Sequence, residues 1–336
     1  MSFKNLVIVL FILFCLTSCF KKDQPIPAKI LSKDVNIFTF SESIYPTQFY
    51  YSLGNNKIVK SNINEGWDLS FESSSKGWHI RLNGGNFLVI YPTDIIDFTT
   101  TQFTVPVKAW KFDKSNGDAD STAINKWVDI SKFPYSYSNK IYLLGKFDGI
   151  KYNPIKKLVF SGVTDTSYVF RIADINNSNL NDVIIRKDTT CNQSFFSTKT
   201  GQQTFIEPPK NEWDLFFGQY VTTLYTDKGV PTPYYVRGTL INPYKVEIAL
   251  DSVTNYNDIT NANVNSFQLK SDWDIIGHNW KSVAIDEQGN TAQYAIRKKY
   301  HYIIRDVKGD YYKLKFLGFY NIKSEPGYPS FEFLKL

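Results

Sequence analysis

The chain has 336 residues, 43% of them hydrophobic, which is enough to bury a sizeable core. Its formal net charge is +6 at pH 7, and its basic residues are interleaved with acidic ones, without a basic run. This distribution argues against a protein that binds nucleic acid. Aromatic residues make up 16% of the chain, with 22 Tyr and 26 Phe against a single Met. This composition favours strands over helices.

An export signal is predicted at residues 1–18. Lys4 precedes an apolar run at residues 6–16 that is too short to cross a bilayer as a helix. The run ends in the sequence LTSC at 16–19, which resembles the lipobox of bacterial lipoproteins, where the chain is cut before the cysteine. We therefore expect Cys19 to carry acyl chains and to anchor the mature protein to a membrane. The alternative is an ordinary signal peptide with an incidental cysteine.

Residues 19–34 are predicted to be a lipidated tether, because two prolines and a charged cluster follow the cysteine. The Lys/Asp cluster resembles signals that send lipoproteins to the outer leaflet in Bacteroidota, so we expect an outer-membrane protein at the cell surface. Once residues 1–18 and the lipidated cysteine are set aside, Cys191 is the cysteine that is left. One thiol forms no internal disulfide and no cysteine-rich metal site, so we interpret Cys191 as a small core residue.

The body of the chain alternates apolar and polar residues with the period of a strand. Clear examples are the segments at 78–83, 311–316 and 330–333. Turn sequences rich in Gly, Asn and Asp separate such segments, as at 83–85 and 308–310. The pattern predicts an all-β, antiparallel protein.

Two parts of the chain repeat the same landmarks. The phrase Trp-Asp-Leu-x-Phe begins at Trp67 and again at Trp213, and an aromatic strand with a glycine turn precedes each copy. We predict two tandem antiparallel β-sandwich or β-barrel-like lobes, residues 35–175 and 176–336, related by internal duplication. A single continuous sandwich is the alternative. Because alternate residues of a strand share a face, we interpret the phrase as core scaffold.

The order of these motifs resembles the HmuY-like haem-binding lipoproteins of Bacteroidota. The motifs are the aromatic strand, the glycine turn, Trp-Asp-x-x-Phe, the RLNG sequence at 81–84, a closing hairpin at 302–316 and the terminal GYPSFEF at 327–333. The resemblance covers nearly the whole predicted mature chain. It implies an all-β protein that captures haem or a related porphyrin outside the cell. It also implies transfer of the haem to an outer-membrane receptor.

The same resemblance implies that His or Met side chains hold the haem iron. Met1 leaves with the predicted signal, so the candidates are His278, in a loop of the second lobe, and His79, on a strand face. Trp280 is a candidate for stacking on the porphyrin ring. The alternative is that these are ordinary loop and surface histidines. A third histidine, His301, alternates with tyrosines in the closing hairpin and is interpreted as structural.

Catalytic signatures are absent from the sequence, including Gly-x-Ser-x-Gly, His-Glu-x-x-His, Cys-x-x-Cys and the P-loop. We therefore predict a binding protein that is not an enzyme, with haem as its cofactor-like cargo and no other metal. The alternative is a surface lipoprotein of the same fold that has lost haem and binds glycan or protein through aromatic loops.

Overall fold

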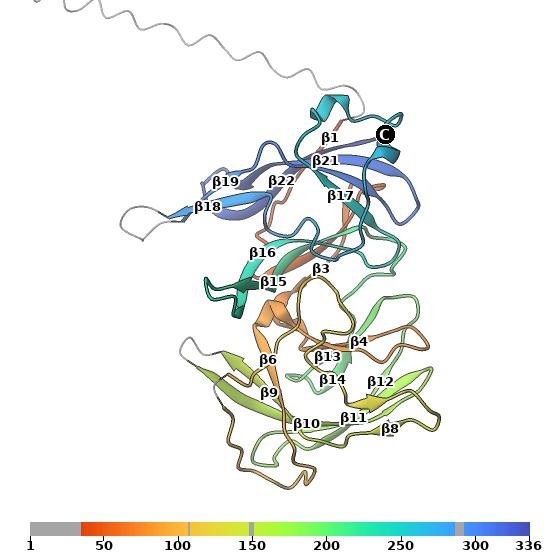
Figure 1. The fold of residues 1–336 in the computed structure, drawn as a ribbon, viewed down its shortest axis with the longest axis vertical. Helices are drawn as coiled ribbons and strands as arrows, with labels where there is room; N and C mark the ends of the chain where they lie inside the picture. The colour runs from red at the N-terminus through yellow and green to blue at the C-terminus, as the bar shows by residue number, and fades with distance from the viewer. Residues whose placement is uncertain (1–34, 107, 148–150, 286–291) are drawn as a thin grey trace, which may run out of the picture. The chain divides into compact units, whose positions relative to one another are not determined.

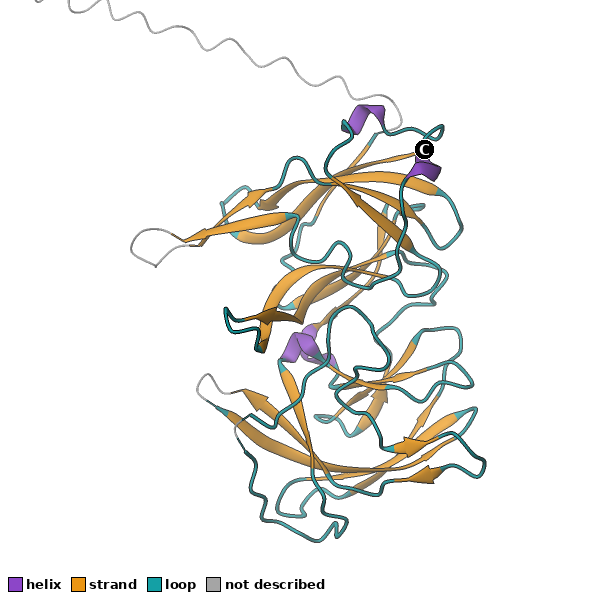
Figure 2. Cartoon of the chain, in the orientation of Figure 1, coloured by secondary structure: helices purple, strands orange, loops and turns teal. Residues whose placement is uncertain are grey.

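The computed structural model describes residues 35–106, 108–147, 151–285 and 292–336. The predicted signal at 1–18, the lipidation site Cys19 and the tether at 19–34 lie outside the described residues. Strands and loops dominate (Figure 2), which confirms the prediction of an all-β antiparallel protein. Within the described ranges, helix is limited to four short 3₁₀ turns: η1 (Asn64–Gly66), η2 (Gly84–Asn86), η3 (Tyr256–Asp258) and η4 (Val264–Ser266).

Two sheets enclose a hydrophobic core that we call core 1. The larger has the order β12 (Asn181–Arg186), β11 (Ser167–Ala173), β10 (Tyr152–Val163), β9 (Tyr142–Phe147) and β6 (Leu88–Pro92). The smaller has the order β14 (Gln202–Thr204), β13 (Gln193–Ser197), β4 (Leu69–Glu72) and β5 (Ile80–Leu82). A short pair, β7 (Val128–Asp129) and β8 (Ser136–Tyr137), lies beside this core.

Two further sheets enclose core 2 (Figure 1). One has the order β1 (Asn36–Thr39), β22 (Pro326–Lys335), β21 (Tyr311–Tyr320), β20 (His301–Arg305) and β17 (Glu247–Asp251). The other has the order β16 (Pro231–Ile241), β15 (Leu215–Tyr225), β2 (Thr47–Ser52) and β3 (Lys57–Ile63). A separate hairpin consists of β18 (Lys281–Ile285) and β19 (Ala292–Ile296).

The two cores do not coincide with the predicted lobes. Core 1 draws on one continuous stretch, residues 69–196, and core 2 draws on residues 40–53 and 215–333 on either side of it. The β2–β3 hairpin pairs with β15 in core 2, with Phe49 opposite Phe217. The β13–β14 hairpin pairs with β4 in core 1, with Phe196 opposite Leu69. Relative to the predicted boundary between residues 175 and 176, each hairpin lies in the core of the other lobe, as β12 does, and we call the two the exchanged hairpins. The division into residues 35–175 and 176–336, and the duplication behind it, stay predictions.

The aspartates of the two Trp-Asp-Leu phrases make matching contacts with the exchanged hairpins. Asp68 Oδ2 accepts hydrogen bonds from the Thr198 backbone N–H at 2.7 Å and hydroxyl at 2.8 Å, just beyond β13. Asp214 accepts from the N–H of Leu53 at 2.8 Å, just beyond β2, and from that of Val307 at 3.1 Å. Asp214 is 1% exposed, and burial raises its pKa to about 6. Each carboxylate therefore fixes the end of an exchanged strand.

The tryptophans of the two Trp-Asp-Leu phrases are not part of core 1 or core 2, contrary to the prediction that they share a core face with the Leu and Phe of their phrase. The strand β4 begins only at Leu69, so its alternation does not extend back to Trp67. Trp67 packs edge-on against Phe195, with ring centroids 5.0 Å apart. Trp213 packs in the same way against Tyr50 at 4.9 Å. Both indoles thus belong to a third hydrophobic cluster, distinct from cores 1 and 2, which we call the central cluster: Tyr50, Val59, Trp67, Phe195, Ile206, Trp213 and Phe216.

Replacing Asp214 with Ala should lower the free energy of unfolding by about 2 kcal/mol, because it leaves the N–H groups of Leu53 and Val307 without their acceptor. Urea denaturation of the purified protein measures the change. The matched control is Asp227→Ala, at an exposed loop position, where a change within about 0.5 kcal/mol is expected. Equal stability of the two variants would contradict the role of Asp214.

Candidate functional site

The turn that follows β5 positions the candidate site. Asn83 is 1% exposed, and its Nδ2 donates to the carbonyl oxygens of Asn64 and Trp67, both at 2.7 Å. At Gly84 a Cβ atom would lie 2.9 Å from the backbone nitrogen of Val221 in β15, so only glycine allows this close approach. The turn is therefore packed against β15, and its residues line two hollows.

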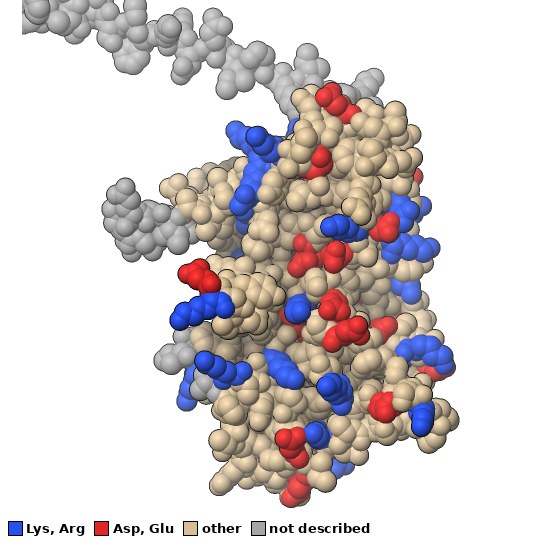
Figure 3. Space-filling view, viewed as in Figure 1, with Lys and Arg blue, Asp and Glu red and all other residues tan. Residues whose placement is uncertain are grey.

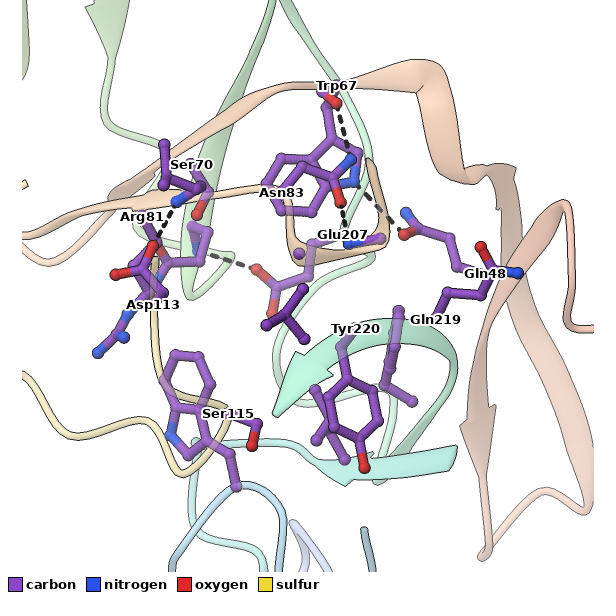
Figure 4. Close-up of a pocket in the computed structure, with 18 of the residues that line it drawn as sticks. Gln48, Trp67, Ser70, Arg81, Asn83, Asp113, Ser115, Glu207, Gln219 and Tyr220 are labelled. Atoms are coloured by element: carbon purple, nitrogen blue, oxygen red, sulfur yellow. Dashed lines mark hydrogen bonds between the residues drawn. The ribbon is translucent and has the colours of Figure 1, made fainter. Parts of the chain in front are cut away.

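The first hollow, which we call the central cavity, has a volume of about 160 Å³ (Figure 4). It lies against the central cluster, and segments from both parts of the sequence contribute to its walls. Its lining includes aromatic, amide and charged side chains: Gln48, Tyr50, Trp67, Arg81, Asp113, Lys114, Gln193, Phe195, Glu207, Trp213, Phe216 and Trp273.

A buried arginine and an aspartate form one wall of the central cavity. Arg81 is 8% exposed, donates to the carbonyl oxygen of Gly117 at 2.7 Å and lies over the Trp273 ring at 4.6 Å. Asp113 accepts from the backbone N–H groups of Leu82 at 2.6 Å and Ala123 at 2.7 Å. Burial raises the pKa of Asp113, and the Arg81 charge opposes that rise. The guanidinium is thus held in place by several partners.

Glu207 also lines the central cavity and is 7% exposed. Its carboxylate accepts hydrogen bonds from the Gln193 backbone N–H at 2.8 Å and from the Asn192 side chain. Burial raises the pKa of Glu207 to about 7, although these hydrogen bonds lower it in part. Among the described residues, no lysine or arginine forms an ion pair with it. The carboxyl group therefore changes its charge near neutral pH.

The second hollow, which we call the aromatic groove, is larger and more open, with a volume of about 850 Å³. It lies between the β15–β16 hairpin, η1, η2 and the end of β9. Its aromatic lining consists of Tyr45, Phe87, Phe147, Tyr234 and Tyr235, and its charged lining of Glu65, Lys146 and Arg237.

The aromatic side chains of the groove are fixed by one another and by the backbone. Phe87 packs edge-on against Phe147 and Tyr235, with centroid distances of 5.7 and 5.8 Å. The Tyr235 hydroxyl donates to the carbonyl oxygen of Gly85 at 2.5 Å. Arg237 lies over the Tyr45 ring at 4.2 Å. The groove therefore offers flat apolar walls with a guanidinium at its edge.

The volume of the groove falls within the range of about 300–1,000 Å³ typical of sites for drug-sized ligands, whereas the central cavity is smaller than that. Figure 3 shows basic and acidic side chains interspersed over the face it presents.

A comparison with known protein families gives one match over most of the chain. The profile of the HmuY protein family matches residues 44–333, which is most of the sequence. The chain belongs to the HmuY family. No protein of curated function matches it.

Solved structures of similar proteins share little sequence with this HmuY-family chain. An apo HmuY analog of Tannerella forsythia is 10% identical, covers 92% of this chain and 98% of its own, and has a TM-score of 0.24. Apo PinO from Porphyromonas gingivitis is 9% identical, with 91% and 98% coverage and a TM-score of 0.25. A candidate HmuY-like heme-binding protein of Bacteroides vulgatus ATCC 8482 is 12% identical, with 53% and 91% coverage and a TM-score of 0.19.

The structure places His278 beside the strand that borders the groove. Gly277 exchanges backbone hydrogen bonds with Thr239 of β16, at 2.9 and 3.0 Å. Lys281, just beyond His278, donates from Nζ to the carbonyl oxygen of Arg237, a groove residue, at 2.6 Å. Burial, with smaller effects of the nearby Lys281 and Arg297 charges, lowers the pKa of His278 to about 4. Its imidazole is therefore neutral at pH 7, the form that binds metals.

The other two predicted residues lie in different surroundings. His79 is half-buried; its Nδ1 lies 2.6 Å from Glu72 Oε2, and its ring stacks on Trp78. Trp280 is 1% exposed and stacks on Phe316 within core 2, with centroids 3.9 Å apart. The three residues are not brought together in either hollow. Their roles toward haem stay predictions.

Sequence reasoning missed the residues that line the two hollows. The groove aromatics come from segments far apart in the chain, so no local pattern joins them. One signal for the cavity was present: Glu207 follows Ile206 and precedes Pro208 and Pro209, a charged residue in an otherwise apolar run. Within the described residues, His, Cys, Asp and Glu form no cluster of three that could hold a metal. None of the helices described there is long and apolar enough to cross a membrane.

The raised pKa of Glu207 predicts a pH dependence of stability. Below its ordinary value of 4.5 the group is protonated in both the folded and the unfolded chain, so its stabilising effect is complete. That effect is lost as the pH rises through about 7, because the unfolded chain ionises first. The loss amounts to about 3 kcal/mol. Urea denaturation at pH 4.5 and pH 8 should show this loss in the wild type relative to Glu207→Gln; parallel profiles would contradict it.

Proposed function

We propose that this chain is a lipid-anchored binding protein of the cell envelope that captures haem or a related porphyrin and has no catalytic activity. Membership of the HmuY family supports this function. The observation that carries it in the structure is the aromatic groove, which combines flat apolar walls, adequate volume and basic side chains.

The chemistry of a porphyrin matches the groove in two respects. A flat aromatic macrocycle gains from stacking against rings such as Phe87 and Tyr235, because both faces lose contact with water. The macrocycle of haem also carries two carboxylates. Lys146 and Arg237 line the groove and would pair with them, and an arginine fork suits a carboxylate well.

Ligation of iron is a separate matter, because no histidine is among the groove residues. Tyr45 and Tyr235 line it, but burial raises the pKa of Tyr45 to about 12 and also raises that of Tyr235, which disfavours the tyrosinate. His278 is the better candidate for an axial ligand, since it is neutral and Lys281, three residues further on, donates a hydrogen bond to the carbonyl oxygen of Arg237. His79 remains the second candidate. Haem iron, when bound, would accept such an imidazole.

The envelope location rests on the lipobox-like sequence that ends at Cys19. Acylation there would hold the protein at the outer membrane, with the groove available to haem outside the cell. Delivery of the haem to an outer-membrane receptor is part of the proposal. Glycan or protein binding through the same exposed aromatic side chains is the alternative, since such rings also stack on sugars.

Titration of haemin into the protein lacking residues 1–18 should give a shifted and sharpened Soret band. His278→Ala should change the band and weaken affinity at least about tenfold, which corresponds to about 1.4 kcal/mol. The matched variant is His79→Ala, which should leave both unchanged, since its ring is paired with Glu72.

The outcomes separate the hypotheses. If His79→Ala alone alters the spectrum, the axial ligand is His79. A wild-type protein without a Soret shift would refute haem binding, and binding on a glycan array would then favour the alternative function.

Cys19→Ser should release the full-length protein from the membrane fraction. The reason is that acyl chains contribute about 0.8 kcal/mol per buried CH₂, and the serine variant cannot carry them. Partition between detergent and aqueous phases measures the change, with Cys191→Ser as the control. Retention of both variants in the detergent phase would show that the anchor lies elsewhere.

A further inference from the structure

We propose that the central cavity is a second binding site, for a small organic ammonium ion about the size of one aromatic ring, with its positive charge directed at Glu207. This site and the aromatic groove both border the glycine turn. The two hollows share Gly85 and Gln219 in their walls but differ in chemistry.

The apolar walls of the cavity are mainly aromatic rings, which favour binding of a cation. Five aromatic side chains of the central cluster line it: Tyr50, Trp67, Phe195, Trp213 and Phe216. They come from both parts of the chain, and two edge-to-face pairs fix their orientation. Aromatic faces attract organic cations, tryptophan most strongly, and the attraction grows when water is excluded.

Glu207 supplies the negative charge. Figure 4 shows its side chain directed into the space between the walls. Its partners there are neutral N–H donors from Asn192 and Gln193, and no ion pair with a basic side chain is found in the described part of the chain. A buried carboxylate without a counter-charge is costly, and a cationic ligand would remove that cost.

Unsatisfied polar atoms also point to a ligand. Gln48 is 3% exposed, and its Nε2 donor has no hydrogen-bond partner. The Oε1 acceptor of Gln193 is likewise buried without a partner. Both residues line the cavity, so an ammonium N–H could bind Gln193 and an oxygen substituent could accept from Gln48.

The positive charges that also border the cavity are already compensated or hydrated. Arg81 donates to Gly117 and is attracted by Asp113 and by the Trp273 ring. Lys114 is exposed to water. Neither competes directly for the Glu207 carboxylate. The size of the ligand follows from the volume of about 160 Å³, since a cavity of roughly 150 Å³ accommodates benzene.

The test uses benzylammonium as the probe and benzyl alcohol as its neutral isostere, each titrated calorimetrically into the full-length protein in detergent at pH 8. We expect benzylammonium to bind at least ten times more tightly than benzyl alcohol. Glu207→Gln should remove this preference. Glu212→Gln, at an exposed position of the same loop, should keep it.

The wild type alone provides a second readout, which does not depend on how well a variant folds. Affinity for benzylammonium should fall several-fold from pH 8 to pH 6, because Glu207 becomes protonated while the probe stays charged. The titratable neighbours Tyr50 and Cys191 have raised pKa values and stay neutral over this range. Arg81, Asp113 and Lys114 are the other charged residues that line the cavity.

Three results would overturn the proposal: no binding of benzylammonium at millimolar concentration, equal affinity for both probes, or a preference that survives in Glu207→Gln. Repeating the titration with haemin present separates this site from the proposed function. Benzylammonium binding that is independent of haemin, or present in a protein that fails to bind haemin, supports the central cavity as a site of its own.

Discussion

The hydrogen bonding of each exchanged hairpin to the aspartate of a Trp-Asp-Leu phrase is the constraint on which the architecture depends. Asp68 binds the turn beyond β13, and Asp214 binds the turn beyond β2. A carboxylate is tolerated at 1% exposure in the case of Asp214 because backbone N–H groups from two separate segments share its charge. Because each aspartate is part of a Trp-Asp-Leu phrase, the same contact orients the adjacent tryptophan away from its core.

The hollows follow from that arrangement. With Trp67 and Trp213 turned outward from cores 1 and 2, their rings meet Phe195 and Tyr50 of the exchanged strands. Because side chains alternate along a strand, β2 places Phe49 in core 2 and Tyr50 on its opposite side. In the same way β13 places Phe196 in core 1 and Phe195 on its opposite side. Aromatic rings and the polar residues beside them therefore gather between the two cores. The glycine turn packed on β15 contributes to the walls of both the smaller cavity and the larger groove.

The two hollows suit different ligands for physical reasons. The groove is open and has basic side chains, which would suit the large flat anion proposed for it. The cavity is small, and its most buried free charge is the carboxylate of Glu207, which favours a small cation. We therefore propose two ligands of opposite charge for a single chain of the HmuY family.

The sequence by itself determined the all-β antiparallel class and the HmuY family, because strand alternation, turn residues and the order of motifs are local features. It also identified the importance of the Trp-Asp-Leu phrases, although it assigned Trp67 to the wrong face, since the start of β4 depends on pairing with β13. Only the tertiary structure decided which hairpin completes which core, because any strand of suitable alternation can pair with several edges. The lining of the central cavity could not be predicted from the sequence for the same reason. Tyr50, Phe195 and Glu207 become neighbours only through the exchange, and Trp280 could be placed inside core 2 only once its packing on Phe316 was known.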